Sequence, residues 1–96
     1  MTTLTETKTP VKFALGKILA TPTVIDLIPP HERRALYARH ARNDWGDMCD
    51  DDKAANDQAL INGSRIFSGY ETSEGKVWII TEADRSATTM LFPSEY

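Results

Sequence analysis

The sequence changes its pattern at Gly63, which follows an asparagine and is typical of a helix end. Beyond it, β-branched and aromatic residues dominate, and residues 65–72 and 76–82 are predicted to form two strands. Residues 73–75 connect these strands and end in a glycine, which suits a β-hairpin loop. A further strand is predicted over residues 88–92. The C-terminal third of the chain is therefore expected to be a three-stranded meander.

The region before the helices begins with a predicted strand. Residues 11–20 alternate apolar and other side chains, and Gly16 interrupts the alternation with a bend or bulge. Thr21 and Pro22 predict the start of a first helix, because threonine can accept hydrogen bonds from the first amides and proline suits the first helical position. Pro30 can open a second helix in the same way.

A third helix is expected after a break at residues 43–46. Glycine in this break permits a left-handed backbone, and Trp45 can fold back onto the core. Asp47 or Asp50 is expected to cap the third helix, which Gly63 ends. Carboxylates at its start would favour the positive end of the helix dipole.

These elements predict an α+β fold. The chain has 96 residues, fewer than the roughly 100–200 of a typical domain, so one domain with one core is expected. Residues 1–10 are expected to form a flexible tail and residues 11–96 the domain. We expect an antiparallel sheet, made of the N-terminal strand and the C-terminal meander, with about three helices packed on one face.

Composition excludes several kinds of protein. Eleven basic and fourteen acidic side chains give an acidic net charge of −3, which argues against general binding to nucleic acid. Cys49, His40 and His31 are too widely spaced for a zinc site, so no metal and no cofactor is expected. A lone cysteine, with neither a signal-peptide pattern nor an apolar run of about 18 residues, predicts a cytoplasmic protein without a membrane partner.

The stretch between residues 44 and 57 holds six aspartates. Helix capping and solvation explain most of them, and a surface for a basic protein partner is the alternative. A standard calcium loop is excluded, because its third, fifth and twelfth positions would hold Gly46, Met48 and Ala55. The candidate binding residues in this stretch are Asp44, Trp45, Asp47, Asp50, Asp51 and Asp52.

The second predicted helix carries the opposite charge. Its basic residues are Arg33, Arg34, Arg39 and Arg42. Pairing with the aspartates is the simplest role for them, and an external anionic ligand is the alternative. No direct contact with nucleic acid is expected from the predicted sheet either. Phe67, Tyr70 and Trp78 would suit an RNA-stacking surface, but the sequence pattern of such sheets is missing.

The loop after the hairpin mixes carboxylate, guanidinium and hydroxyl groups. Its candidate binding residues are Glu82, Asp84, Arg85 and Ser86. Three interpretations stay open: a turn in which Arg85 pairs with Glu82, a binding surface, and acid–base catalysis. No nucleophile elbow, phosphate-binding glycine loop or dinucleotide fingerprint is present, so no catalytic residue is assigned.

Two segments carry a resemblance to known proteins. Residues 38–47, with the sequence ARHARNDWGD, and residues 78–93, WIITEADRSATTMLFP, together with Ala20, Thr21 and Pro22, resemble a group of small bacterial proteins usually labelled hypothetical or plasmid-related. The resemblance implies a bacterial, mobile-element origin over about residues 12–96. It carries over no catalytic residue, since the group has no assigned activity. It also suggests that the helix break and the 82–89 loop belong to one surface.

Two functions from different classes follow from these observations. The favoured one is a small non-enzymatic accessory protein that binds a protein partner and modulates a nucleic-acid-processing system through its acidic face. The alternative is a small hydrolase or nuclease that uses Glu82, Asp84 and Arg85 with His40. An exposed edge of a short sheet would also allow a homodimer.

Overall fold

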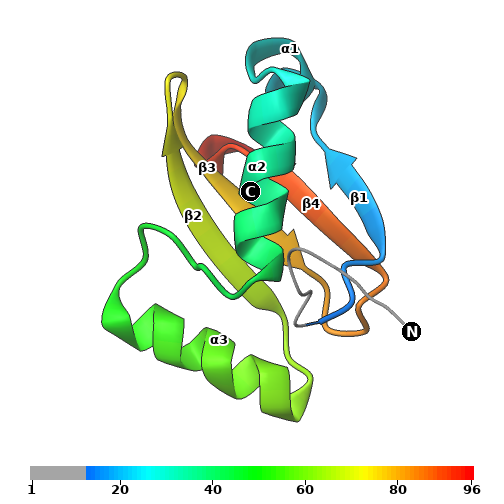
Figure 1. Ribbon diagram of the computed structural model, residues 1–96, viewed down its shortest axis with the longest axis vertical. Coiled ribbons are helices and arrows are strands. Elements are labelled where there is room, and N and C mark those ends of the chain that lie inside the picture. The colour runs from blue at the N-terminus through cyan, green and yellow to red at the C-terminus, as the bar shows by residue number, and fades with distance from the viewer. Residues whose placement is uncertain (1–12) are drawn as a thin grey trace, which may run out of the picture.

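The computed structural model describes residues 13–96, and the predicted tail of residues 1–10 lies outside this range. Figure 1 shows a four-stranded sheet with a helix lying across one face and another helix beside one edge. The elements are, in order, β1 (Lys17–Ala20), α1 (Pro22–Leu27), α2 (Pro30–Ala41), α3 (Asp50–Asn62), β2 (Ile66–Thr72), β3 (Gly75–Thr81), β4 (Ala87–Leu91) and the 3-10 helix η2 (Pro93–Glu95).

The α+β class and the C-terminal meander are confirmed, but the sheet is mixed rather than antiparallel. Its strand order is β1-β4-β3-β2, and β1 runs parallel to β4. The pairing runs from Lys17 beside Ala87 to Ala20 beside Met90. Parallel neighbours need a long connection between them, and here all three helices and the hairpin lie between β1 and β4.

The local signals for helix ends are largely confirmed. The Thr21 hydroxyl accepts from the Val24 amide at 3.4 Å at the start of α1, and α2 begins at Pro30. Gly63 ends α3 with a φ of +80°. The predicted cap of α3 is wrong, because Cys49 occupies that position and Asp50 already belongs to the first turn. The predicted first strand is shorter than expected, with its residues 11 and 12 outside the described range.

The face of the sheet beneath α1 and α2 holds the main core. Alternate residues of β2, β3 and β4 point to this face and are buried. The main cluster consists of Val24, Ile28, Leu36, Tyr70, Val77, Ile79 and Met90. A second cluster, under α3, consists of Trp45, Ala59 and Ile66.

The helix α3 lies beside the outer edge of β2 and covers that edge at Phe67. The Asn56 carboxamide accepts from the Phe67 amide at 3.0 Å and donates to the Phe67 carbonyl at 2.7 Å. The chain between α2 and α3 closes the next position, where the Gly69 amide donates to the Trp45 carbonyl and the Asp47 amide donates to the Gly69 carbonyl. These bonds hold the start of α3 close to the strands.

Among the helices in residues 13–96, none combines the length and apolar character needed to span a membrane.

A candidate binding groove between α3 and the sheet

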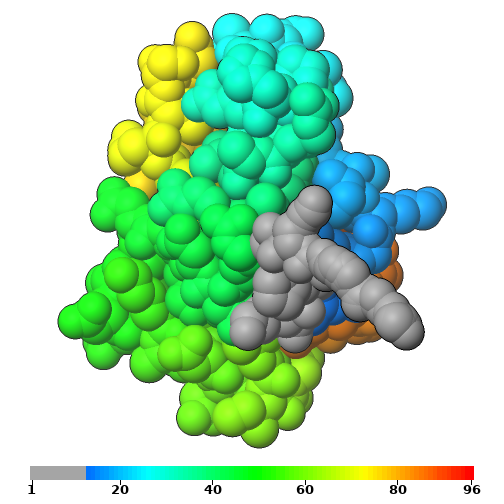
Figure 2. All heavy atoms as spheres, viewed as in Figure 1, coloured from blue at the N-terminus to red at the C-terminus, as the bar shows by residue number. Residues whose placement is uncertain are grey.

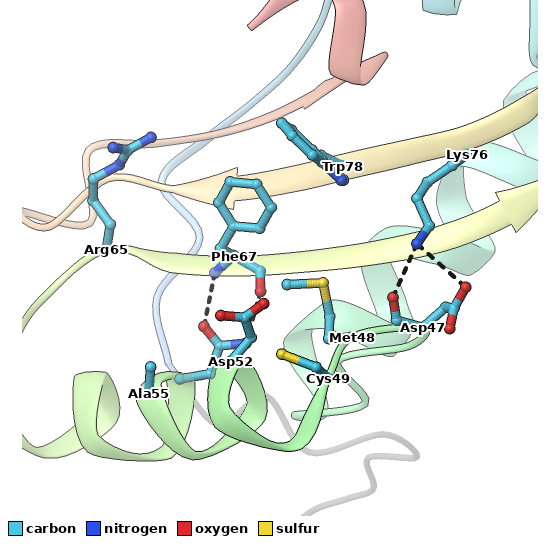
Figure 3. A pocket seen from close by; sticks show the side chains of 10 residues that line it. Asp47, Met48, Cys49, Asp52, Ala55, Arg65, Phe67, Lys76 and Trp78 are labelled. Atoms are coloured by element: carbon cyan, nitrogen blue, oxygen red, sulfur yellow. Dashed lines mark hydrogen bonds and ion pairs between the residues drawn. The ribbon is translucent and has the colours of Figure 1, made fainter.

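A groove of about 560 Å³ lies between the first half of α3 and the strands β2 and β3 (Figure 3). Its volume falls within the range of about 300–1,000 Å³ that is typical of ligand pockets. The lining residues used below are Met48, Asp52, Arg65, Phe67, Lys76 and Trp78. Hydrophobic and charged side chains therefore meet in one cavity.

The strand side of the groove is an aromatic wall formed by Phe67 and Trp78. Their rings meet edge to face with centroids 4.7 Å apart. Both side chains alternate with buried residues of β2 and β3, so they point to the face of the sheet away from α2. Tyr96 extends the cluster at 5.7 Å from Trp78, on a C-terminal turn fixed by hydrogen bonds from Phe92 and Thr21 to the Glu95 carboxylate.

The floor of the groove depends on Gly69. A Cβ atom at this position would lie 3.2 Å from the Met48 sulfur and 3.4 Å from Cδ1 of Trp78. The glycine therefore lets Met48 and Trp78 close on each other across β2, and a larger residue would push them apart. Methionine suits such a floor because its side chain adapts to what lies against it.

The rim of the groove carries more unpaired negative than positive charge. Lys76 donates to the Asp47 carbonyl and forms a 3.2 Å ion pair with the Asp47 carboxylate. Arg65 donates to the Tyr96 hydroxyl at 2.8 Å, and its Nε lies 4.0 Å from the Glu82 carboxylate. Within residues 13–96, no ion pair engages the exposed carboxylates at the start of α3, Asp50, Asp51 and Asp52. Asp52 points from α3 toward the strands (Figure 3).

Two predicted binding residues of the helix break are structural. The Arg39 guanidinium bonds both carboxylate oxygens of Asp44, at 2.7 and 3.3 Å, and lowers the pKa of that carboxyl. This pair confirms that an arginine of the second helix meets an aspartate. Trp45 is only 5% exposed, and its indole N–H donates to Asp57 at 3.2 Å. Asp44 and Trp45 therefore anchor the break, and only Asp47 reaches the groove.

The candidates in the loop between β3 and β4 form a turn that holds the end of α3. Asp84 accepts from the Ser86 amide at 3.0 Å, as predicted for a local turn, and hydrogen bonding by Ser86 lowers the pKa of the Asp84 carboxyl. Arg85 donates to the Ser64 carbonyl at 2.7 Å and to the Ala59 carbonyl at 3.1 Å. The expected pairing of Arg85 with the Glu82 carboxylate is wrong, because that carboxylate faces Arg65.

The two predicted segments do not come together in one compact site. The helix break lies at the beginning of α3 and the 82–89 loop contacts its end, as Figure 1 shows. Thirteen residues of α-helix separate these ends, a length of about 20 Å. The candidates that the structure brings to the groove are Asp47 and Asp52, with Asp50 and Asp51 exposed beside it.

His40, the proposed base of the enzymatic alternative, lies in a buried chain of hydrogen bonds. Its Nδ1 lies 2.5 Å from the Ser68 hydroxyl and its Nε2 lies 2.8 Å from the Thr81 hydroxyl. The chain continues from Thr81 to Thr88 at 2.7 Å and ends where Thr88 donates to the Leu15 carbonyl at 2.7 Å. Burial lowers the pKa of His40 to about 4.

The direction of each hydrogen bond in this series follows from the last one, between Thr88 and the Leu15 carbonyl. Thr88 uses its hydrogen on the Leu15 carbonyl, so Thr81 must donate to Thr88. Thr81 then accepts from His40 Nε2–H, and Ser68 donates to the bare Nδ1. Both ring nitrogens are engaged, and His40 has no exposed surface. The arrangement suits a neutral structural histidine and gives it no access to a substrate.

The remaining possible metal ligands also stay apart. Among the described residues, no group of three or more histidine, cysteine or acidic side chains is placed to hold a metal ion. Cys49 is exposed at the start of α3. Comparison with protein-family models, curated proteins and solved structures finds no match. The function is therefore argued from the geometry of the groove.

Sequence reasoning missed the aromatic side of the groove. Phe67 and Trp78 were grouped with Tyr70 as one stacking surface, yet Tyr70 is 1% exposed and points to the opposite face. The alternation of side chains along a strand could have separated them, because residues 67 and 70 of one strand must face opposite sides of the sheet. The hairpin register then pairs Phe67 with Ile80, which brings Trp78 diagonally next to Phe67.

Proposed function

We propose that this chain is a non-enzymatic protein-binding module whose groove takes a basic side chain from an extended segment of a partner protein. The observation that carries the proposal is that the aromatic side chains of Phe67 and Trp78 line the same groove as the carboxylate of Asp52. A lysine or arginine has an apolar stem and a charged end, and the groove offers a surface for each part.

Both parts of such a side chain would gain free energy in the groove. A cation over an aromatic ring is stabilised by about 0.5–2 kcal/mol, more when water is excluded. A charge-assisted hydrogen bond to Asp52 would add to this and would fix the direction of the side chain. The neighbouring Asp50 and Asp51 would speed encounter with a basic segment, because unpaired surface charge steers association.

The same charges weigh against nucleic acid as the occupant. Phosphates would meet the carboxylates at the start of α3, while Lys76 and Arg65 are already engaged.

Basic segments are common in proteins that handle nucleic acids, so the groove fits the expected role of modulating a nucleic-acid-processing system. The plasmid-related resemblance is the support for placing that role in a mobile element. The exposed Cys49 fits a reducing compartment such as the cytoplasm.

The hydrolase or nuclease alternative has less support. It requires His40 and the Glu82, Asp84 and Arg85 loop to act on one substrate, and His40 is fully buried. Arg85 is occupied with the carbonyls at the end of α3. A homodimer is a separate proposal, because the groove leaves the β1 edge of the sheet free.

A set of peptides that differ only in one central residue tests the proposal. Each peptide carries lysine, arginine, alanine or glutamate in an otherwise uncharged extended sequence, and binding is measured by fluorescence anisotropy. We expect the lysine and arginine peptides to bind at least about tenfold more tightly than the glutamate peptide, a difference of about 1.4 kcal/mol. Equal binding of the glutamate and lysine peptides would overturn the proposal.

Matched substitutions locate the site. Asp52→Asn removes a charge that lines the groove, whereas Asp51→Asn removes the same charge one residue away, outside the lining. Affinity for the lysine peptide should fall about tenfold in Asp52→Asn and no more than about twofold in Asp51→Asn. Trp78→Ala should weaken binding as much as Asp52→Asn does. Similar losses in both asparagine variants would indicate long-range charge rather than this groove.

A further inference from the structure

The two edges of the four-stranded sheet differ in how they are protected. On the β2 edge, the outward main-chain groups of Phe67 are bonded by Asn56, and those of Gly69 are bonded by Trp45 and Asp47. On the β1 edge, the Lys17 amide donates to Ser86 and the Thr21 amide donates to Met90, so these residues face β4.

The alternation along β1 leaves Ile18 and Ala20 facing outward. Their amides and carbonyls point away from β4, and no main-chain group within residues 13–96 pairs with them. Figure 2 shows β1, in blue, at the margin of the molecular surface. Natural proteins guard such an edge with charges, proline or a bulge, and β1 carries only Lys17 at its start.

The open edge is also apolar. Within residues 13–96, four of the six large hydrophobic residues that are exposed lie on β1 and α1: Ile18, Leu19, Ile25 and Leu27. Ile18 and Leu19 are 49% and 45% exposed, one on each face of the sheet. Beside Ala20 lies a hollow of about 260 Å³, and Ile25, Pro30 and Tyr37 line it together with Arg33 and Arg34.

We infer that a second copy of this chain pairs with β1 in an antiparallel manner, across a two-fold axis at Leu19. Only one register pairs both outward residues of each copy with outward residues of the other copy. In it, Ile18 lies opposite Ala20 of the other copy, and Ala20 lies opposite Ile18. This gives four main-chain hydrogen bonds. A register centred on Ala20 would place Ile18 opposite Pro22, which has no amide hydrogen.

The side chains fit this register on both faces. On the α2 face, Ile18 of one copy stands over the small Ala20 of the other, where the hollow can receive it. On the opposite face, the two Leu19 side chains meet directly. Lys17 faces Thr21 of the other copy, so the two lysines do not repel each other.

The protected β2 edge limits the assembly to two chains. Growth of the sheet needs an open edge, and pairing of the two β1 strands leaves outside only the β2 edges, whose outward groups at Phe67 and Gly69 are already bonded. The interface is therefore isologous and closes as a two-fold dimer. The inference does not depend on the proposed function, because the groove lies at the opposite edge of the sheet.

Disulfide trapping tests the register. Directly opposite residues that are not hydrogen-bonded have Cα atoms about 4.5 Å apart, within disulfide range. Leu19→Cys is made in a Cys49→Ser background, where serine suits the cap of α3. Ile61→Cys in the same background is the control, since Ile61 is 80% exposed on α3. Oxidation should cross-link most Leu19→Cys chains and few control chains. Equal cross-linking, or none, overturns the register.

Light scattering tests the dimer itself. At about 100 µM the wild-type protein should have twice the mass of its 10.7 kDa chain. Ile18→Pro removes an outward amide hydrogen that β4 does not use, so the variant should be a folded monomer. Leu19→Lys should also be monomeric, with Ile61→Lys as the dimeric control. If Ile18→Pro fails to fold, Leu19→Lys decides. A monomeric wild type, or a dimeric Leu19→Lys, overturns the inference.

Discussion

At the scale of single residues, His40 links stability to pH. Because burial lowers its pKa to about 4, the folded protein holds it neutral, whereas the unfolded chain binds a proton near its usual value of 6.5. As pH falls from 6.5 toward 4, the unfolded state binds more protons, so folding becomes less favourable. The contribution of His40 to the free energy of unfolding is complete above pH 6.5 and is lost as the pH falls from 6.5 to about 4.

The expected loss is measurable by urea denaturation. Between about pH 7.5 and pH 5 the free energy of unfolding should fall by about 2 kcal/mol through His40 alone. His40→Gln should unfold more easily at every pH, because it disturbs the buried chain, and should show a flatter dependence over the same range. An equally steep dependence in His40→Gln would assign the effect to other groups.

Two glycines with similar φ angles, Gly46 and Gly63, should differ in their tolerance of alanine. Gly46 has a φ of +74°, and a Cβ atom there would lie 2.0 Å from the Gly69 carbonyl oxygen. Gly63 has a φ of +80°, with open space around it. Gly63→Ala should cost about 1–2 kcal/mol, the cost of the left-handed conformation. Gly46→Ala should cost at least about 3 kcal/mol in urea denaturation, and equal losses would contradict the close approach of the break to β2.

At the scale of secondary-structure elements, the end of α3 depends on a residue far along the chain. Arg85 donates to the Ala59 carbonyl, which also accepts from the Gly63 amide, and to the Ser64 carbonyl just beyond the helix. Arg85→Ala should lower the free energy of unfolding by about 1–2 kcal/mol and speed amide exchange in the last turn of α3. Arg42→Ala, an exposed control, should change stability by less than about 0.5 kcal/mol. Equal effects would show that Arg85 does not cap α3.

The sequence predicted elements wherever the signal was local. Thr21, Pro22 and Gly63 act on their own neighbourhood, and the hairpin loop constrains both of its strands. The parallel pairing of β1 with β4 could not be read in this way, because it joins residues about 70 positions apart. The cap of α3 was misassigned because aspartate is a strong local capping signal, whereas the helix begins after Cys49, where the chain is bonded to β2.

At the scale of the whole molecule, the candidate site shows the same division. The charges at the start of α3 were predicted as a binding surface, and Asp52 does line the groove. Its aromatic wall comes from strands that only the tertiary fold brings opposite α3. The 82–89 loop was expected on the same surface, but α3 separates it from the helix break by its full length. The sequence therefore shows the cluster of carboxylates, but it does not show that the fold brings aromatic residues of β2 and β3 to the same groove.

The groove and the β1 edge lie at opposite edges of one sheet, so their functions should be independent. Substitutions that are far apart and share no contacts usually act additively. Leu19→Lys should therefore bind the lysine peptide with an affinity within about twofold of wild type, one peptide per chain, while it is monomeric. Asp52→Asn should keep the dimeric mass while it loses peptide affinity. Isothermal titration and light scattering on both variants measure the two properties separately. If the monomeric variant also lost peptide binding, the groove would depend on the dimer and the two edges would be linked through the sheet.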